Sequence, residues 1–99
     1  MNAATALTAV GPTYILPVIK ALKEAAIGKG LSENDAQFAA AQTVLGTGQL
    51  VLKTREDPDV LKLMIGTRTL KEEEARATFA AAFEAAFEKI SASEKKLSP

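Results

Sequence analysis

Two combinations of residues are the first candidates for chemistry in this sequence. The string "GTGQLV" at Gly46 to Val51 is similar to the start of a dinucleotide-binding loop, in which glycines let backbone amides approach a pyrophosphate. The third glycine is missing and no strand pattern precedes the string, so we interpret these glycines as helix-packing positions. Tyr14 and Lys20 suggest a proton-transfer pair, but residues six apart on a helix lie on different faces. Tyr14 is therefore interpreted as a packed aromatic residue.

Charged residues supply two further candidates. The cluster Glu72 to Glu74 is explained by the first turn of a helix, where the positive end of the helix dipole favours acidic side chains. Thr67, Arg68 and Thr69 lie between two predicted helices, where an arginine can hold a carboxylate through two hydrogen bonds. They form the one candidate site for a small anion, but a loop with helix caps at both ends is the simpler interpretation of these residues. Because the chain has no Cys and no His, zinc sites and serine or cysteine triads are excluded, and we predict no catalytic or metal-binding residue.

Composition limits the class of protein further. The chain has 99 residues, a formal net charge of zero and no cluster of basic residues with interleaved aromatics, so we expect no nucleic-acid partner. The N-terminus lacks the basic segment of a secretory signal and we find no lipidation motif, which favours the cytoplasm. The longest uncharged run, Ala36 to Leu52, contains three Gln and two Gly and is at most marginal for a bilayer span. We expect no membrane association.

Helical periodicity is the only regular pattern in the chain. Gly11-Pro12 predicts the start of a helix that kinks at Pro17 and ends at about Lys29 before Gly30. Ser32 predicts the cap of a second helix that runs to about Thr54. This second helix carries no charge between Asp35 and Lys53, which is typical of a helix surrounded by others. A strip of small residues on it suits close approach of another backbone: Ala39, Thr43 and Gly46.

The second half of the sequence predicts a short helix and a long one. Asp57 caps the short helix, in which Leu61, Met64 and Ile65 are expected to point inward. Thr69 with Glu72 predicts the capping box of the last helix, which ends at about Ile90 or Ser93. Its core stripe comprises Phe79, Phe83, Phe87 and Ile90. We therefore expect an all-α domain of about four helices at residues 1–92, followed by a solvated tail at 93–99.

The apolar surface of these helices exceeds what one short chain covers. Hydrophobic residues make up 47% of the sequence, but only 5% of all residues are aromatic, and Ala contributes little buried area. The helix from Pro12 is apolar over a wider face than one neighbouring helix can cover. Burial against a second copy of the chain is the simplest solution, and it predicts a homodimer.

Several strings together resemble one family. The segment Thr8 to Tyr14 keeps the Gly-Pro and the Tyr of a Ser-Gly-Ser-Gly-Pro-Ala-Tyr stretch. It is followed in order by "GL" at Gly30, "AAQTVLG" at Ala40 to Gly46, "DPDVLK" at Asp57 to Lys62 and "RATFAAAFEAA" at Arg76 to Ala86. These strings are similar to the C-terminal dimerisation domain of pyrroline-5-carboxylate reductase, over about Thr5 to Ile90. The resemblance implies an interlocked helical domain of the kind found at the C-terminus of 6-phosphogluconate dehydrogenase.

The resemblance also implies a function and assigns residues to it. It implies the homodimerisation domain of an NAD(P)H-dependent oxidoreductase, with an interface that contains Tyr14, Ile15, Ile19, Ala39, Thr43, Gly46, Phe79 and Phe83. The cofactor belongs to a nucleotide-binding domain that is missing here, so we expect these 99 residues to bind no cofactor and to be inactive alone. The family's substrate loop is shortened to a segment that contains Gly66, Thr67, Arg68 and Thr69.

Two alternative functions stay open. In the first, the chain is part of a reductase for a different imino or keto acid, with the cofactor domain supplied by a missing N-terminal region. Alternatively, it is a free-standing interaction module that binds another protein through Glu72 to Glu74.

Overall fold

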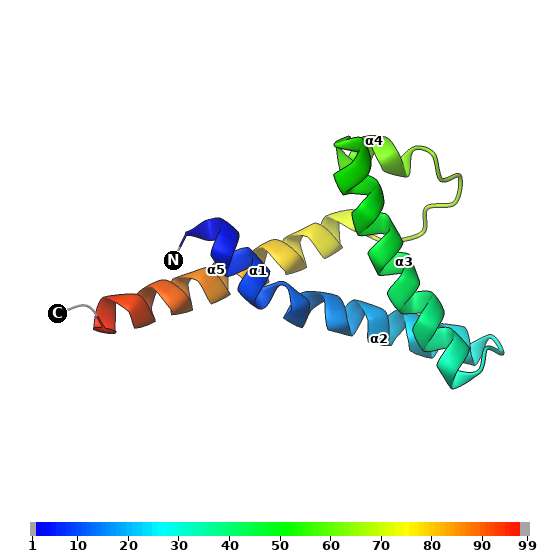
Figure 1. Cartoon of the computed structure of the whole chain (residues 1–99), viewed down its shortest axis with the longest axis horizontal. Coiled ribbons are helices and arrows are strands. Elements are labelled where there is room, and N and C mark those ends of the chain that lie inside the picture. The colour runs from blue at the N-terminus through cyan, green and yellow to red at the C-terminus, as the bar shows by residue number, and fades with distance from the viewer. Residues whose placement is uncertain (1, 98–99) are drawn as a thin grey trace. The chain divides into compact units, whose positions relative to one another are not determined.

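The chain is almost entirely helical. The computed structural model describes residues 2–97, with side chains through residue 93, and these residues contain no strand. The helices are α1 (Ala3–Val10), α2 (Pro12–Gly28), α3 (Glu33–Thr54), α4 (Pro58–Lys62) and α5 (Glu72–Leu97) (Figure 1). The predicted all-α fold is confirmed.

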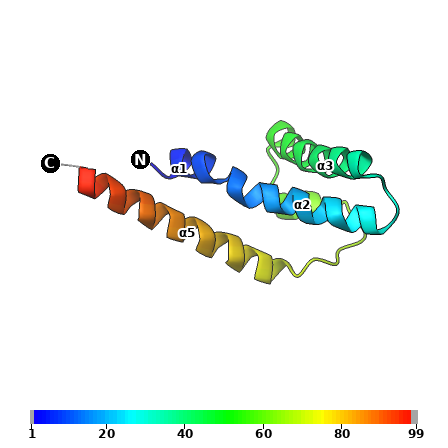
Figure 2. The same cartoon turned by 90° about the horizontal axis from the view of Figure 1, so that it is seen from below.

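The helices form two compact units, which we describe separately. The terminal unit contains the described residues up to Leu16 and from Leu70 onward, and in it α1 packs against α5 (Figure 2). The central unit contains residues 17–69, with most of α2, all of α3 and α4. The border between the units lies between Leu16 and Pro17, inside α2, although this helix continues through the proline to Gly28.

Helix α1 is an element that the sequence analysis missed. Asn2 caps it, because the backbone N–H of Thr5 donates to the Asn2 side-chain oxygen at 2.8 Å. The helix is followed directly by Gly11, whose φ of −50° and ψ of −43° keep the backbone helical up to Pro12. A Cβ at Gly11 would lie 2.6 Å from the Leu7 carbonyl oxygen, so glycine is required there. α1 and α2 thus follow one another as two parts of a nearly continuous helix.

The turn between α2 and α3 follows the expected signals. α2 ends at Gly28, and Gly30 adopts a φ of 107°, which favours glycine. The Leu31 N–H donates back to the Ala26 carbonyl at 3.2 Å and satisfies one of the last carbonyls of the helix. Ser32 then caps α3 by accepting from the Asp35 N–H at 3.2 Å. Both predicted helix ends are confirmed.

Lys23 ties α2 to the first turns of α3. Its ammonium donates to Gln37 Oε1 at 2.8 Å and lies 3.4 Å from Glu33 Oε1, and its side chain is only 13% exposed. Lys20 pairs with Glu24 within α2 at 3.5 Å, but both of these side chains are more than 60% exposed. Screening by water weakens exposed pairs much more than sheltered ones.

Replacing each lysine by alanine separates these two contacts. Both changes alter helix propensity equally, so the difference reports the contacts. We expect Lys23→Ala to lower the free energy of unfolding by about 1 kcal/mol, and Lys20→Ala by at most about 0.5 kcal/mol. Urea unfolding at one fixed protein concentration measures both, and equal effects would contradict the role assigned to Lys23.

The segment around α4 differs in part from expectation. Asp57 caps the helix as predicted, accepting from the Asp59 N–H at 2.8 Å, and Leu61 is buried. The expectation that Met64 and Ile65 point inward is wrong for the single chain, because they are 78% and 61% exposed. The reason is local: the helix ends at Lys62, and the residues beyond it no longer follow helical periodicity.

Helix α5 begins later and extends further than predicted. It starts at Glu72, so Lys71 and not Thr69 occupies the cap position, and the predicted capping box is wrong. Three consecutive glutamates in the first turn stabilise this helix start, because their negative charges interact favourably with the positive end of the helix dipole. The backbone stays helical to Leu97, beyond the expected end at Ile90 or Ser93. The helix therefore enters the segment that we expected to be a tail, of which residues 98 and 99 lie outside the described residues.

Candidate dimer interface

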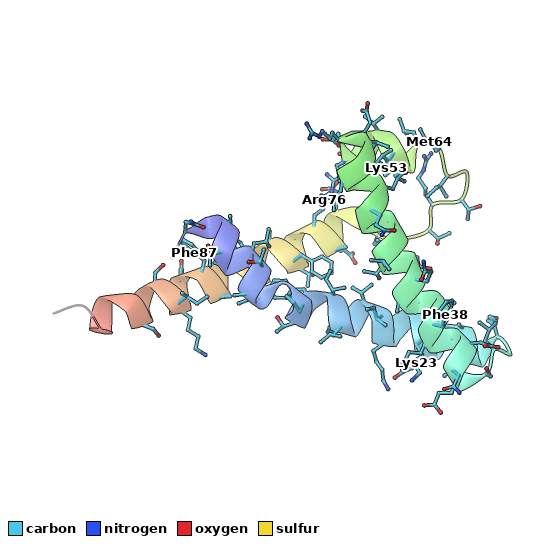
Figure 3. All side chains as sticks on the ribbon, in the orientation of Figure 1. Lys23, Phe38, Lys53, Met64, Arg76 and Phe87 are labelled. Atoms are coloured by element: carbon cyan, nitrogen blue, oxygen red, sulfur yellow. The ribbon has the colours of Figure 1, made fainter. Side chains whose placement is uncertain are left out.

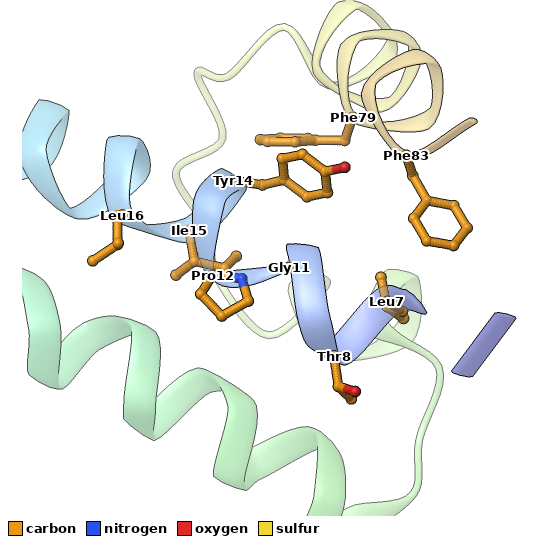
Figure 4. Close-up of a pocket in the computed structure, with 9 residues that line it drawn as sticks. All are labelled: Leu7, Thr8, Gly11, Pro12, Tyr14, Ile15, Leu16, Phe79 and Phe83. Atoms are coloured by element: carbon orange, nitrogen blue, oxygen red, sulfur yellow. The ribbon is translucent and has the colours of Figure 1, made fainter. Parts of the chain in front are cut away.

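An apolar groove of about 680 Å³ lies in the terminal unit, between α1, the first turns of α2 and α5 (Figure 4). It is lined by Leu7, Thr8, Gly11, Pro12, Tyr14, Ile15, Leu16, Phe79 and Phe83. Four of the predicted interface residues, Tyr14, Ile15, Phe79 and Phe83, are brought together here. Phe79 and Phe83 are one turn apart on α5, which places both rings on the same face.

Tyr14 closes one side of this groove with an unpartnered hydroxyl. Its ring lies beside the ring of Phe79 (Figure 4). The hydroxyl is shielded from solvent and has no hydrogen-bond partner among the described residues. A buried polar group without a partner costs about 1–3 kcal/mol, so the ring and not the hydroxyl stabilises this site.

Two substitutions separate the ring from the hydroxyl. We expect Tyr14→Phe to leave the free energy of unfolding unchanged or to raise it by up to about 1 kcal/mol, because it removes only the unpartnered group. Tyr14→Ala removes the ring as well and lowers it by about 3 kcal/mol. Thermal and urea unfolding measure both variants. A loss of more than about 1 kcal/mol in Tyr14→Phe would show that the hydroxyl has a partner.

The other predicted interface residues belong to the central unit. Ile19 is half-buried on α2, and Ala39 and Thr43 are exposed on α3, where the Thr43 hydroxyl donates to the Ala39 carbonyl at 2.7 Å. Gly46 is half-buried, and a Cβ built on it meets no atom within 4 Å. Within one copy, no neighbour therefore makes the close approach for which this glycine is suited.

The glycine string of the sequence lies inside a regular helix. Gly46 to Val51 are all part of α3, which runs without interruption from Glu33 to Thr54. No strand among the described residues precedes them, so they cannot form the strand-turn-helix cradle of a dinucleotide. The helical location of these glycines is confirmed, and their role in packing against another helix stays a prediction.

The candidate substrate segment connects α4 with α5. Gly66, Thr67, Arg68 and Thr69 are all exposed and lie outside regular helices. Within the described part of the chain, no three His, Cys, Asp or Glu residues are grouped so that they could hold a metal ion.

The sequence analysis overlooked large exposed apolar residues on α3. Phe38, Leu45 and Leu52 are each separated by seven residues and all are exposed. The seven-residue spacing was the signal available in the sequence.

One stretch of the described chain meets the length and hydropathy of a membrane span. It covers Ala3–Gly28, 26 residues, and it meets the test by length and composition alone. It differs from Ala36 to Leu52, the longest uncharged run in the sequence. Only 6% of the apolar window in this stretch is buried in the single chain.

The fold and these exposed apolar faces define a small helical association domain. A family model described as pyrroline-5-carboxylate reductase dimerisation matches residues 1–93. The chain belongs to this family. No solved structure matches the chain.

Curated relatives give the same assignment. The pyrroline-5-carboxylate reductase of Methanosarcina acetivorans is 38% identical over 88 residues, which cover 80% of this chain and 33% of that protein. The Arabidopsis thaliana reductase is 43% identical over 61 residues, which cover 62% of this chain and 22% of the relative. The Synechocystis reductase is 40% identical over 62 residues, which cover 63% of this chain and 23% of that protein. The chain thus spans a third or less of the length of these relatives.

The alignment with the Methanosarcina protein has more positions than the number of residues that this chain contributes to it. It extends over 88 positions, whereas 80% of 99 residues is about 79, so roughly nine positions have no residue here. This chain is therefore shortened somewhere within the matched domain.

Proposed function

We propose that this chain is the homodimerisation domain of an NAD(P)H-dependent oxidoreductase of the pyrroline-5-carboxylate reductase type. The observation that carries the proposal is the small core of a single copy. Among the described residues only Ala6, Ala36, Ala40 and Leu61 are buried hydrophobic residues, whereas sixteen large hydrophobic residues are exposed. Three alanines and one leucine bury too little apolar area to hold helices together, because stabilisation follows the area removed from water. A second copy supplies the missing area.

The proposed interface uses both units. In the terminal unit it includes the groove residues Tyr14, Ile15, Phe79 and Phe83. In the central unit it includes Ile19 on α2 and the small residues Ala39, Thr43 and Gly46 on α3. Obligate interfaces of this kind commonly bury about 2,000 Å² or more and have the composition of a domain core. The long uncharged part of α3 supports this interpretation.

Chemistry belongs to a larger assembly in this proposal. The relatives are reductases by name, and each is at least three times as long as the region it shares with this chain. The described residues contain no strand, so they lack the fold that cradles a dinucleotide, and the cofactor would be held by another domain. We place the assembly in the cytoplasm and assign Ala3–Gly28 to protein contacts and not to a bilayer.

The segment Gly66 to Thr69 is the proposed contribution to substrate binding. The relatives' substrate is a carboxylate by its name, and Arg68, flanked by Thr67 and Thr69, can hold a carboxylate through two hydrogen bonds. The shortening of this chain against the Methanosarcina protein favours a second candidate, a reductase for a different imino or keto acid. A segment of different length would shape a different substrate site.

Sedimentation equilibrium tests the homodimer directly. We expect twice the chain mass of 10.4 kDa at micromolar concentration without detergent. Gly46→Leu should weaken the dimer at least about fivefold, because an inserted side chain in a packed interface costs about 1–3 kcal/mol or more. Lys29→Leu, an exposed residue beyond the end of α2, serves as the control and should leave the mass unchanged. A monomeric folded chain, or a chain that needs detergent to stay in solution, would refute the proposal.

An absorbance assay tests whether this chain is inactive without a cofactor-binding domain. With NADPH or NADH and pyrroline-5-carboxylate, we expect these 99 residues to give no oxidation of the nicotinamide above the blank, because no described residue forms a dinucleotide cradle. Turnover that scales with the concentration of the purified chain would contradict the assignment as a dimerisation domain.

A further inference from the structure

A continuous apolar stripe runs along one face of α3 in the central unit. We define this outer stripe as Phe38, Ala41, Leu45, Gly48 and Leu52, which follow one another at alternating steps of three and four residues. All five are exposed, and Phe38, Leu45 and Leu52 are exposed by 71%, 55% and 79%. Alternating steps of three and four are the spacing of a seam between two packed helices. The buried residues Ala36 and Ala40 lie on another face of the same helix, so the outer stripe has no partner within the unit.

The charges of α3 are confined to its two ends and have opposite signs. Glu33 and Asp35 stand in the first turn, Lys53 in the last turn, and Arg55 directly follows the helix. Between Asp35 and Lys53 there is no charged side chain. Figure 3 shows Phe38 and Lys53 towards opposite ends of the helix. A surface of this kind is complementary to a copy of itself that runs in the opposite direction.

We propose that α3 packs antiparallel against α3 of a second copy along the outer stripe, with the two-fold axis at Leu45. In this register Leu45 meets its own counterpart, and Phe38 lies opposite Leu52 of the second copy. The same register places Asp35 opposite Arg55 of the second copy, because Asp35 and Arg55 are each ten residues from Leu45 in the sequence. Ala41 and Gly48 lie between the large residues and leave room for them. This inference rests on the proposed function and names one of its surfaces.

Charge selects the antiparallel direction. A parallel pair would place the acidic ends of both helices together and the basic ends together, which is unfavourable at both ends. An antiparallel pair matches opposite charges and opposite ends of the helix dipoles. It is also self-complementary, as a closed two-fold interface requires. A second copy of this chain is therefore the occupant that this surface fits.

Single cysteines test both the contact and its direction, since the native chain has none. Under mild oxidation, Leu45→Cys should form a covalent dimer, because the residue lies on the two-fold axis. Phe38→Cys alone should not, since in the proposed register the two copies of residue 38 are about 21 Å apart along the helix axis. A mixture of Phe38→Cys with Leu52→Cys should give the mixed covalent dimer. Lys20→Cys, exposed on α2, is the matched negative control.

Each pattern of cross-links decides the proposal. Self-linking of Phe38→Cys at the rate of Leu45→Cys would show a parallel pair and overturn it. A chain that sediments as a dimer but links at none of the three positions would overturn it while the homodimer stands. A monomeric native chain would remove the proposed function and this surface together. Far-ultraviolet circular dichroism confirms that each variant is folded before it is scored.

A charge exchange gives an independent readout. Asp35→Arg should weaken the dimer about fivefold, because it places two cationic side chains together at each end of the pair. Adding Arg55→Asp should restore most of the lost dimer affinity. Aspartate tolerates the left-handed backbone at this position, where φ is 57°. Failure of the second change to rescue the first would overturn the register.

Discussion

Burial of apolar helix surface against a second helix is the interaction on which this structure depends. A helix in water is stabilised mainly by what covers its apolar face, because intrinsic propensity alone is marginal. Among the described residues of one copy, the buried hydrophobic residues are three alanines and one leucine, and large apolar residues of α1, α3 and the α4–α5 connection are exposed. The secondary structure is complete while the core is not. In the proposed dimer, a second copy covers these exposed faces.

Local signals set the helix ends independently of that core. Asn2, Ser32 and Asp57 each cap a helix by accepting from a backbone N–H two or three residues ahead. Gly30 closes the end of α2 with a positive φ. Such contacts satisfy the backbone groups that any helix leaves unpaired at its ends. They explain why the helices of one copy are well defined although few of their side chains are buried.

The same distinction explains what the sequence could predict. The bounds of α3 and the all-α fold followed from Ser32, Gly30 and an uninterrupted helical period, which are local features. Helix α1 was missed because Gly11-Pro12 looks like a start, although Gly11 here keeps the helical backbone. The inward direction expected for Met64 was wrong because periodicity was extended beyond Lys62, where the helix ends.

The candidate interface shows a corresponding limit. Tyr14 and Ile15 could be assigned to one apolar face and Phe79 and Phe83 to another from spacing alone. Their meeting in one groove depends on contact between the two ends of the chain, which no local pattern encodes. The spacing of the outer stripe on α3 is visible in the sequence, but only the structure shows that these residues are exposed.

Membership of the reductase dimerisation family is consistent with a core that is incomplete in one copy. The chain covers only a minor part of each relative, and that part is the one named for association. The Gly66 to Thr69 connection lies outside the regular helices, between α4 and α5.

The dependence of thermal stability on protein concentration tests the central claim most directly. If two copies share one core, folding and association are one event, and the midpoint of thermal unfolding must rise with concentration. Followed by circular dichroism at 222 nm over a hundredfold dilution, the midpoint should fall steadily as the chain is diluted. A midpoint that stays constant over the whole range would show that one copy completes its own core, and it would contradict this account.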